Sequence, residues 1–336
     1  MTELRKKLIE VKNLKTHFYT EAGTAKAVDG VSFDIYQGEV LGVVGESGSG
    51  KSVTALSINR LIPMPPGEIV GGEILYNGKN LLAMTFEEIR NYRGKEIAMI
   101  FQEPMTSLNP VFRIDVQMNE VLMKHENLSW DESNKRSVEM LRAVGMPDPE
   151  KRMREYPHQF SGGMRQRVMI AMALIANPAL LIADEPTTAL DVTIQAQILD
   201  LMMKVKELRE EAAILLITHD LAVVAETCDR VIVMYGGKIQ EIAEIEELFA
   251  NPLHPYTIGL MASIPRPSQD GEKIERLKAI KGMVPPIIEM PVGCKFCTRC
   301  DEAKDKCETE QPELINMGKD HFVRCHKYSD ANFANA

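Results

Sequence analysis

The stretch that determines the fold reads Gly45-Glu46-Ser47-Gly48-Ser49-Gly50-Lys51-Ser52. Its spacing of glycine, four residues, glycine, lysine and serine is typical of a phosphate-binding loop. The glycines let the backbone curl until several N–H groups point at one phosphate. Since a chance match is expected in only about 1% of chains of this length, the stretch predicts binding of a nucleotide's phosphates.

The residues on either side of the loop support this interpretation. Residues 40–44 form a short apolar strand that runs into the loop, and a helix is predicted from about Lys51 to Leu61, ending before Pro63. The N-terminal end of that helix adds partial positive charge beside the phosphates. Lys51 is expected to contact the β- and γ-phosphates of ATP, and Ser52 is expected to ligate Mg²⁺.

Further along the chain, apolar runs of strand length alternate with helical segments. Residues 97–101, 180–183 and 214–217 are typical of buried strands, whereas residues 111–176 have a helical, charged pattern. This alternation predicts a parallel sheet covered by helices on both faces. Residues 231–242, with two glycines at their centre, predict a hairpin.

Two carboxylates follow the strand predicted at residues 180–183. Asp184 and Glu185 directly follow an apolar run, and ligands of open parallel sheets bind where the strands end. Asp184 fits the acid that coordinates Mg²⁺ in phosphate-loop ATPases. Glu185 is placed to accept a proton from an attacking water.

A third motif reads Ser161-Gly162-Gly163-Met164-Arg165-Gln166, followed by a helical run. Ser161 is predicted to cap that helix. The two glycines leave the N–H groups at the helix start accessible to an anion. By itself, Ser-Gly-Gly is more often a simple turn before a helix, so its meaning depends on the other motifs.

Together, these motifs resemble the ATPase subunits of ABC transporters. The phosphate loop, Gln102, the Ser161 motif, Asp184-Glu185, an Ala-Leu-Asp ending at Asp191, and His219 follow in that family's order over about residues 5–250. The resemblance implies an α/β fold: a phosphate-loop NTPase (RecA-like) core with an antiparallel β subdomain and an α-helical subdomain. We expect this nucleotide-binding domain at 1–250 and a small cysteine-rich extension at 251–336, beginning where prolines interrupt the pattern.

In that family, two ATPase subunits enclose two ATP molecules head to tail. The resemblance implies that Ser161, Gly162 and Gly163 contact the γ-phosphate of ATP held mainly by a partner subunit, and that Asp191 lies across the interface. Gln102 would contact Mg²⁺ and the attacking water, His219 would hold the γ-phosphate and position Glu185, and all three are assigned as catalytic. Further nucleotide contacts are assigned to these residues: Gly45, Glu46, Ser47, Gly48, Ser49, Gly50, Lys51, Ser52, Val53, Gln166 and Asp184.

The family also stacks an N-terminal aromatic ring on adenine. Phe18 aligns best with that position, and Tyr19 is its neighbour. Spacing does not choose between the two rings, and packing in the core is the alternative for either. We predict that Phe18 contacts the adenine.

Five of the six cysteines lie close together, at positions Cys294, Cys297, Cys300, Cys307 and Cys325. In a reducing compartment such clustering indicates a metal site or cluster more than disulfides. Four thiolates can hold either zinc or an iron–sulfur cluster. Either group would stabilise an extension that has no obvious core of its own.

The same tail narrows the resemblance to the ATPase subunits of dipeptide and oligopeptide importers. Residues 251–257 (NPLHPYT) and the Gly-Cys-x-Phe-x-x-Arg-Cys pattern from Gly293 carry it. Members of that subfamily carry a cluster in this tail, and their four ligand positions correspond to Cys294, Cys300, Cys307 and Cys325. From this resemblance we expect a 4Fe-4S cluster held by these four cysteines. Cys297 is additional and gives a Cys-x-x-Cys-x-x-Cys run like that of ferredoxins. Structural zinc bound by Cys294, Cys297 and two others is the alternative.

The composition limits the choice of partners. The chain has 336 residues, 45% of them hydrophobic, and a formal net charge of −9, which argues against broad nucleic-acid binding. We expect no nucleic-acid partner. Since the apolar runs are too short to cross a bilayer and no signal peptide is visible, we expect a peripheral protein at the cytoplasmic face of the cell membrane.

The main hypothesis is therefore an ATPase subunit that powers import of dipeptides or oligopeptides. Its expected partners are a second ATPase subunit, two membrane permease subunits and, indirectly, an extracytoplasmic peptide-binding protein. One alternative is a soluble ABC-type ATPase that acts on DNA or ribosomes, although those proteins usually carry a long coiled coil or two ATPase domains. Redox or metal sensing by the tail would be an added regulatory layer.

Overall fold

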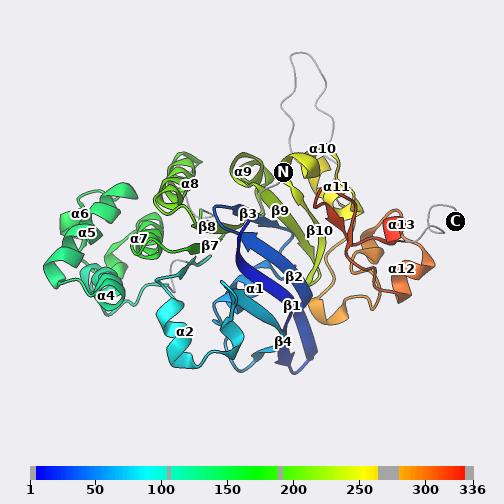
Figure 1. The fold of residues 1–336 in the computed structure, drawn as a ribbon, viewed down its shortest axis with the longest axis horizontal. Coiled ribbons are helices and arrows are strands. Elements are labelled where there is room, and N and C mark those ends of the chain that lie inside the picture. The colour runs from blue at the N-terminus through cyan, green and yellow to red at the C-terminus, as the bar shows by residue number, and fades with distance from the viewer. Residues whose placement is uncertain (1–4, 104–106, 188–191, 264–279, 330–336) are drawn as a thin grey trace, which may run out of the picture. The chain divides into compact units, whose positions relative to one another are not determined.

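A computed structural model describes residues 5–103, 107–187, 192–263 and 280–329 of the chain (Figure 1). The chain divides into two units, each described by itself below. The first comprises residues 1–9, 34–39 and 75–217, and the second comprises residues 10–33, 40–74 and 218–336. None of the described helices is both long and apolar enough to cross a bilayer.

The first unit contains a parallel sheet made of β6 (Ile97–Ile100), β7 (Leu180–Asp184) and β8 (Ala213–Ile217). Leu180 lies opposite Ile97 on one side and Ala213 on the other. Every residue of these strands is buried, and their near-continuous apolar runs are typical of parallel strands covered on both faces. The predicted parallel pairing is confirmed.

A group of helices follows β6 in the first unit. Helix α4 (Ile114–Glu126) packs against α5 (Trp130–Ala143), and α7 (Gly162–Leu174) packs against both (Figure 1). The buried Asn119 and Ser137 join α4 to α5 by a hydrogen bond of 2.7 Å. Ser129 and Glu132 form a capping box at the start of α5. The remaining elements of this unit are β5 (Lys79–Asn80), η1 (Leu81–Ala83), α2 (Phe86–Tyr92), α6 (Pro149–Arg152), η2 (Pro157–Gln159) and α8 (Val192–Glu207).

The second unit is built around β3 (Val40–Val44), which pairs in parallel with β9 (Arg230–Tyr235). Strand β9 continues through Gly236 and Gly237, both at positive φ, into the antiparallel β10 (Lys238–Glu244). This confirms the predicted hairpin, because two residues at positive φ form the turn that suits tightly connected strands. Three long strands, β1 (Lys7–Thr20), β2 (Gly23–Tyr36) and β4 (Gly67–Tyr76), contribute residues to both units.

The helix after the phosphate loop, α1 (Lys51–Ile58), ends three residues before the predicted Leu61. Asn59 is the C-cap residue of the helix, and Arg60 has φ +50°, outside the right-handed helical region. The prolines therefore follow the end of the helix and do not cause it. The other helices before the tail are α9 (Leu221–Thr227), α10 (Ile245–Ala250) and α11 (Pro255–Ala262).

The C-terminal segment joins the sheet of the second unit. Strand β12 (Phe322–Val323) pairs antiparallel with β10, and β11 (Ile315–Asn316) pairs with β12. The buried Glu241 of β10 accepts hydrogen bonds from the backbone N–H groups of Leu253 and His254, both at 2.8 Å. The tail thus gains a core by packing on the hairpin. Its short helices are η3 (Ile287–Glu289), η4 (Cys297–Arg299), α12 (Asp305–Thr309) and α13 (His326–Ser329).

Candidate nucleotide site and cysteine cavity

The phosphate loop begins where β3 ends. Gly45 has φ +150°, and a Cβ at this position would lie 2.2 Å from the carbonyl oxygen of Met234 in β9. Gly50 has φ +102°, and a Cβ there would lie 2.4 Å from the carbonyl oxygen of Ala27. Both positions therefore require glycine for conformational and steric reasons. At the far end of the loop, the N–H of Gly237 donates to the carbonyl oxygen of Ser49 at 3.0 Å.

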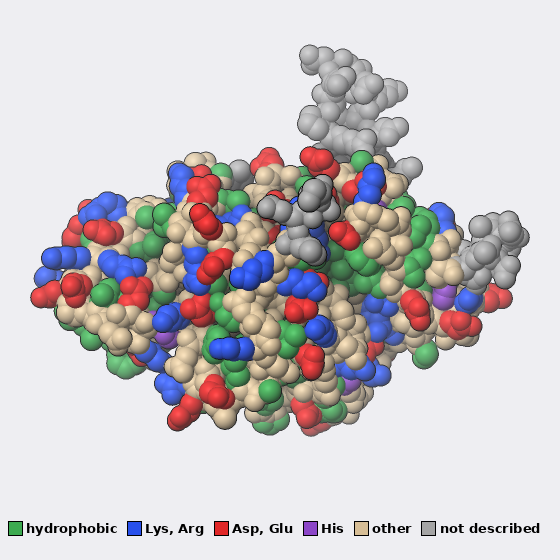
Figure 2. Space-filling model, viewed as in Figure 1, with side chains coloured by type: hydrophobic (Ala, Val, Ile, Leu, Met, Phe, Trp, Pro, Cys, Tyr) green, Lys and Arg blue, Asp and Glu red, His purple; other side chains and the backbone are tan. Residues whose placement is uncertain are grey.

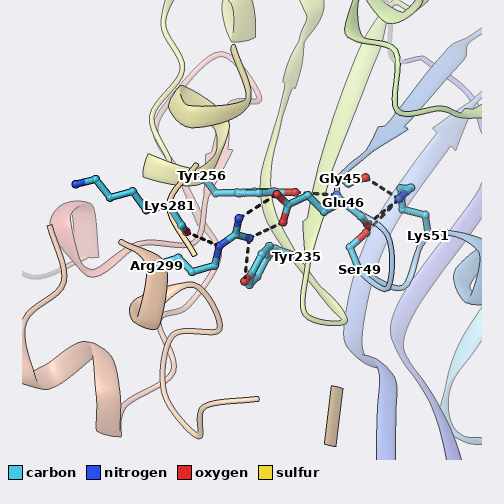
Figure 3. Close-up of polar contacts among 8 residues, drawn as sticks. All are labelled: Gly45, Glu46, Ser49, Lys51, Tyr235, Tyr256, Lys281 and Arg299. Atoms are coloured by element: carbon cyan, nitrogen blue, oxygen red, sulfur yellow. Dashed lines mark hydrogen bonds and ion pairs between the residues drawn. The ribbon is translucent and has the colours of Figure 1, made fainter. Parts of the chain in front are cut away.

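Lys51 is buried, with 6% of its surface exposed. Its Nζ donates to the carbonyl oxygens of Gly45 at 2.7 Å and Glu46 at 3.0 Å (Figure 3). These contacts bridge the two ends of the turn and hold the ammonium group within the loop. A lysine held there suits the expected contact with phosphate oxygens.

Glu46 is oriented away from Lys51. Its carboxylate makes a two-pronged ion pair with the guanidinium of Arg299, and its backbone N–H donates to the Tyr256 hydroxyl at 2.8 Å (Figure 3). The sequence assigned Glu46 to nucleotide binding as a member of the loop. In the structure, both its side chain and its N–H group are engaged by the C-terminal part of the chain.

Two further predicted residues lie in the second unit. His219 is exposed and follows Thr218, whose N–H donates to the carbonyl oxygen of Val43 in β3, the strand that leads into the loop. The Phe18 ring is half-buried beside Gly67, where a Cβ would lie 2.9 Å from the ring. Tyr19 is 51% exposed. The choice between these two rings as the adenine contact stays a prediction.

The first unit brings Gln102 and Glu185 together. The Nε2 of Gln102 donates to Oε2 of Glu185 at 3.2 Å, although the two residues are 83 positions apart. Asp184 is 3% exposed at the end of β7. Glu185 has φ +46°, uncommon for a residue with a side chain, and its N–H donates to the carbonyl oxygen of Ile217 at 2.9 Å. Such a strained backbone often marks a functional position.

The Ser161 motif starts α7 as predicted. The Ser161 hydroxyl accepts a hydrogen bond from the N–H of Met164 at 3.3 Å, which confirms the N-cap. Ser161 and Gly162 are exposed and Gly163 is half-buried, so the start of the helix is accessible to a ligand. Gln166 is 1% exposed, and its Nε2 donates to the carbonyl oxygen of Pro186. This contact, which the sequence did not reveal, ties α7 to the segment after Glu185. Asp191 lies outside the described residues.

All five clustered cysteines line one cavity in the second unit, together with His254 and His326. The cavity among these side chains has a volume of ≈ 20 Å³. None of the five forms a disulfide. Burial raises the pKa of Cys294 to about 12 and that of Cys300 to about 11, so these thiols are protonated at neutral pH when no metal replaces the proton.

His254 faces the same cavity with an orphaned nitrogen. Its Nδ1 accepts the N–H of Tyr256 at 3.0 Å, whereas its buried Nε2 has no hydrogen-bond partner among the described residues. Among the residues that the structure describes, no group of three or more histidine, cysteine, aspartate or glutamate side chains has the geometry to hold a metal ion. The cysteines line one cavity, but they are not arranged as a preformed metal site.

Two family models match the chain. The model described as ABC transporter matches residues 28–188, and the model described as oligopeptide/dipeptide transporter, C-terminal region, matches residues 240–307. The first covers the phosphate loop, the Ser161 motif and the Asp184-Glu185 pair. The second covers the start of the tail and four of the clustered cysteines.

Curated relatives match over nearly the whole chain. The oligopeptide transport ATP-binding protein AppD of Bacillus subtilis is 54% identical over 323 residues, covering 96% of this chain and 97% of AppD. OppD of the same organism is 52% identical over 318 residues, covering 95% of this chain and 88% of OppD. The dipeptide transport ATP-binding protein DppD of the same organism is 47% identical over 319 residues, covering 95% and 94%.

Solved structures match over most of the chain. The dimeric structure of a post-hydrolysis state of the ATP-binding cassette MJ0796, bound to ADP and Pi, gives a TM-score of 0.64 at 27% identity. The match covers 70% of this chain and 98% of the cassette. A second dimeric structure of MJ0796 gives the same TM-score at 28% identity. These matches confirm the predicted α/β cassette fold.

Proposed function

The chain belongs to the ABC transporter ATP-binding subunits of the oligopeptide and dipeptide type, and from this membership we propose that it hydrolyses ATP to drive the import of peptides. The observation that carries the proposal is the 54% identity to an oligopeptide transport ATP-binding protein over 96% of the chain. The match to the C-terminal region specific to these transporters also disfavours a soluble ATPase that acts on DNA or ribosomes. The face in Figure 2 carries interspersed acidic and basic side chains.

The chemistry assigned to this chain is attack of water on the γ-phosphate of ATP. The phosphate loop and Lys51 would hold the β- and γ-phosphates, while Ser52 and Asp184 would ligate Mg²⁺. Glu185 would accept the proton of the attacking water. The 3.2 Å contact between Gln102 and Glu185 supports a shared role, because it places an amide beside the proposed base.

Assembly into a pair completes the proposed site. The exposed start of α7 offers N–H groups and a hydroxyl to an anion, and we assign that anion to ATP held mainly by a partner ATPase subunit. Asp191 is assigned to the interface with the partner subunit. His219 is assigned to the γ-phosphate. Two membrane permease subunits and an extracytoplasmic peptide-binding protein complete the proposed transporter. The chain would act at the cytoplasmic face of the membrane, where ATP is available.

Reconstitution of the transporter in lipid vesicles tests this function. ATP hydrolysis is expected to rise when peptide-loaded binding protein is added, and labelled peptide is expected to accumulate in the compartment that contains the ATPase subunits. Lys51→Ala should abolish both effects without preventing assembly. Hydrolysis that responds to DNA or ribosomes but not to peptide-loaded binding protein would contradict the proposal.

We further infer that the cysteine cavity holds a 4Fe-4S cluster, with Cys294, Cys300, Cys307 and Cys325 as ligands. Two observations on the described residues support the fit. The cavity is lined by five thiols, and His254, which also lines it, has a buried Nε2 without a hydrogen-bond partner. Inorganic sulfide would supply the acceptor that this nitrogen lacks. The cluster would supply a structural cross-link with redox sensitivity.

Anaerobic purification distinguishes the cluster from zinc. We expect about four iron and four sulfide per chain and broad absorption near ~400 nm. Cys297 also lines the cavity, and Cys297→Ser is expected to keep the iron content, whereas Cys300→Ser should lower it. Stoichiometric zinc without visible absorption would contradict the assignment of the cluster.

A further inference from the structure

One ion pair joins the phosphate loop to the cysteine-rich tail. The guanidinium of Arg299 contacts both carboxylate oxygens of Glu46, with Nη2 3.1 Å from Oε1 and Nη1 on Oε2 (Figure 3). The two residues are 253 positions apart. Paired N–H donors facing two oxygens form the most directional arrangement that arginine makes with a carboxylate. The ion pair is therefore a specific, directional contact between the phosphate loop and the tail.

The surroundings hold the arginine in place. The Arg299 side chain is 5% exposed, and its Nε donates to the carbonyl oxygen of Lys281 at 2.9 Å. Its guanidinium carbon lies 5.7 Å from the Tyr235 ring centroid and 5.9 Å from that of Phe296, which adds cation–π attraction. An arginine fixed on several sides loses little further freedom when it binds Glu46. The geometry of the pair is thus set by the tail.

Tyr256 adds a second tie at the same residue. Its hydroxyl accepts the backbone N–H of Glu46, and its ring packs edge-on against Tyr235 with centroids 4.8 Å apart. Tyr256 belongs to α11, whereas Arg299 belongs to η4. Two elements of the C-terminal segment therefore hold the backbone and the side chain of one loop residue.

The charge of Glu46 explains why this arrangement matters. Glu46 is the second residue of a loop whose assigned ligand carries several negative charges. Its carboxylate side chain is 29% exposed, so water screens it only in part. With Arg299 present, the charge is compensated and directed away from Lys51. Without Arg299, a carboxylate would stand beside the phosphates and repel them.

We propose that Arg299 is a positioning residue for nucleotide binding: it holds Glu46 out of the phosphate site, compensates its charge, and makes the geometry of the loop depend on the C-terminal extension. The inference rests on the loop as the ATP site. Arg299 lies between Cys297 and Cys300 in a turn that lines the cysteine cavity. The same residue therefore couples the fold around the cysteines to affinity for the nucleotide, and by linkage the coupling is reciprocal.

Calorimetric titration of the full chain with MgADP tests the proposal, because ADP binding does not depend on hydrolysis. Arg299→Ala is expected to weaken binding about tenfold by leaving the Glu46 carboxylate unpaired. Glu46→Gln removes the charge that needs compensation and keeps an amide oxygen that can accept from Arg299, so it should change the Kd for MgADP by less than about threefold. In the Glu46→Gln background, Arg299→Ala should then have little further effect. In the assembled transporter, Arg299→Ala should raise the KM for ATP and leave kcat unchanged.

Matched variants separate this role from general destabilisation. Lys281→Ala removes another cation of the same segment, whose ion pair with Asp301 is exposed, and should leave MgADP binding within about twofold. Arg299→Lys keeps the charge without the two-pronged geometry and should weaken binding by an intermediate factor. If Arg299→Ala does not fold, Arg299→Lys replaces it in the comparison with Glu46→Gln.

Two results would overturn the positioning role. One is wild-type MgADP affinity in both Arg299→Ala and Arg299→Lys. The other is an equal loss of affinity in the Glu46 and Glu46→Gln backgrounds, which would show that the effect does not pass through the ion pair. Lys51→Ala is tested in parallel, because wild-type affinity in that variant would instead refute the loop as the nucleotide site.

Discussion

At the scale of single residues, we assign two separate tasks to the two ring nitrogens of His254. Nδ1 caps α11 by accepting the N–H of Tyr256, which leaves the proton of the neutral ring on Nε2. Burial lowers the pKa of His254 to about 4, so the ring is neutral at pH 7. The buried Nε2 has no hydrogen-bond partner among the described residues, and we propose that its proton is donated to a group held in the cysteine cavity.

Two substitutions separate these tasks. His254→Asn keeps a cap acceptor for Tyr256 but removes the distal donor, so we expect near-wild-type thermal stability of the metal-free protein and faster loss of visible absorption in air. His254→Gln keeps a donor near the Nε2 position but loses the cap, which should cost about 1 kcal/mol of folding free energy and preserve the absorption. Iron content and absorbance decay report the first effect, and urea unfolding reports the second. Identical decay rates in the two variants would contradict a donor role for Nε2.

Residue identities at the loop could be predicted from the sequence, whereas their partners could not. The pattern from Gly45 to Ser52 is local and reflects backbone chemistry that each glycine must satisfy. The Arg299–Glu46 and Gln166–Pro186 contacts join residues far apart in the chain, and no periodicity encodes them. The sequence contains one signal for the contact of Arg299, which is its position between Cys297 and Cys300. If a cysteine cluster buries this arginine, the arginine needs an anionic partner.

At the scale of secondary-structure elements, the start of α7 combines a structural and a functional role in Ser161. Its hydroxyl caps the helix, and its exposure leaves it accessible to a phosphate from a partner subunit. Asparagine and aspartate cap helices as well as serine does. Asparagine is neutral, whereas aspartate carries a negative charge. Comparing the two therefore separates capping of the helix from contact with a phosphate.

We therefore compare Ser161→Asn with Ser161→Asp. Both should unfold in urea within about 0.5 kcal/mol of the wild type, because the cap is retained. ATP hydrolysis by the assembled transporter should fall at least about tenfold further in Ser161→Asp than in Ser161→Asn, since the added carboxylate repels the γ-phosphate. Equal rates in the two variants would exclude the start of α7 from the phosphate site.

Most elements could be predicted because their patterns are strong and local. The apolar runs at β3, β7 and β8, the glycine pair of the hairpin and the serine cap of α7 each follow from a few adjacent residues. The end of α1 could not, because it depends on Arg60 adopting a positive φ for which the sequence holds no marker. Strand β12 was missed for a related reason: two residues form a strand only because β10 offers an edge.

At the scale of the whole molecule, the C-terminal extension contacts the phosphate loop directly. It adds strands to the sheet of β9 and β10, lines the cysteine cavity and reaches Glu46 of the phosphate loop through Arg299. The division after residue 250 remains a prediction, and this contact network argues for a close dependence of one part on the other. A change in the fold of the tail would then change the affinity of the proposed transporter for nucleotide.

We propose that this chain hydrolyses ATP with Glu185 as the base, in a site completed by a paired subunit. Glu185→Gln is the most direct test, because the new amide retains the shape of the side chain and an oxygen that can accept from Gln102. The measurement is ATP turnover by the assembled transporter, with binding of MgATP followed in parallel. We expect turnover to fall by about 10²–10⁴-fold, MgATP binding to persist, and the closed ATPase pair to accumulate. Turnover near the wild-type rate would contradict the account.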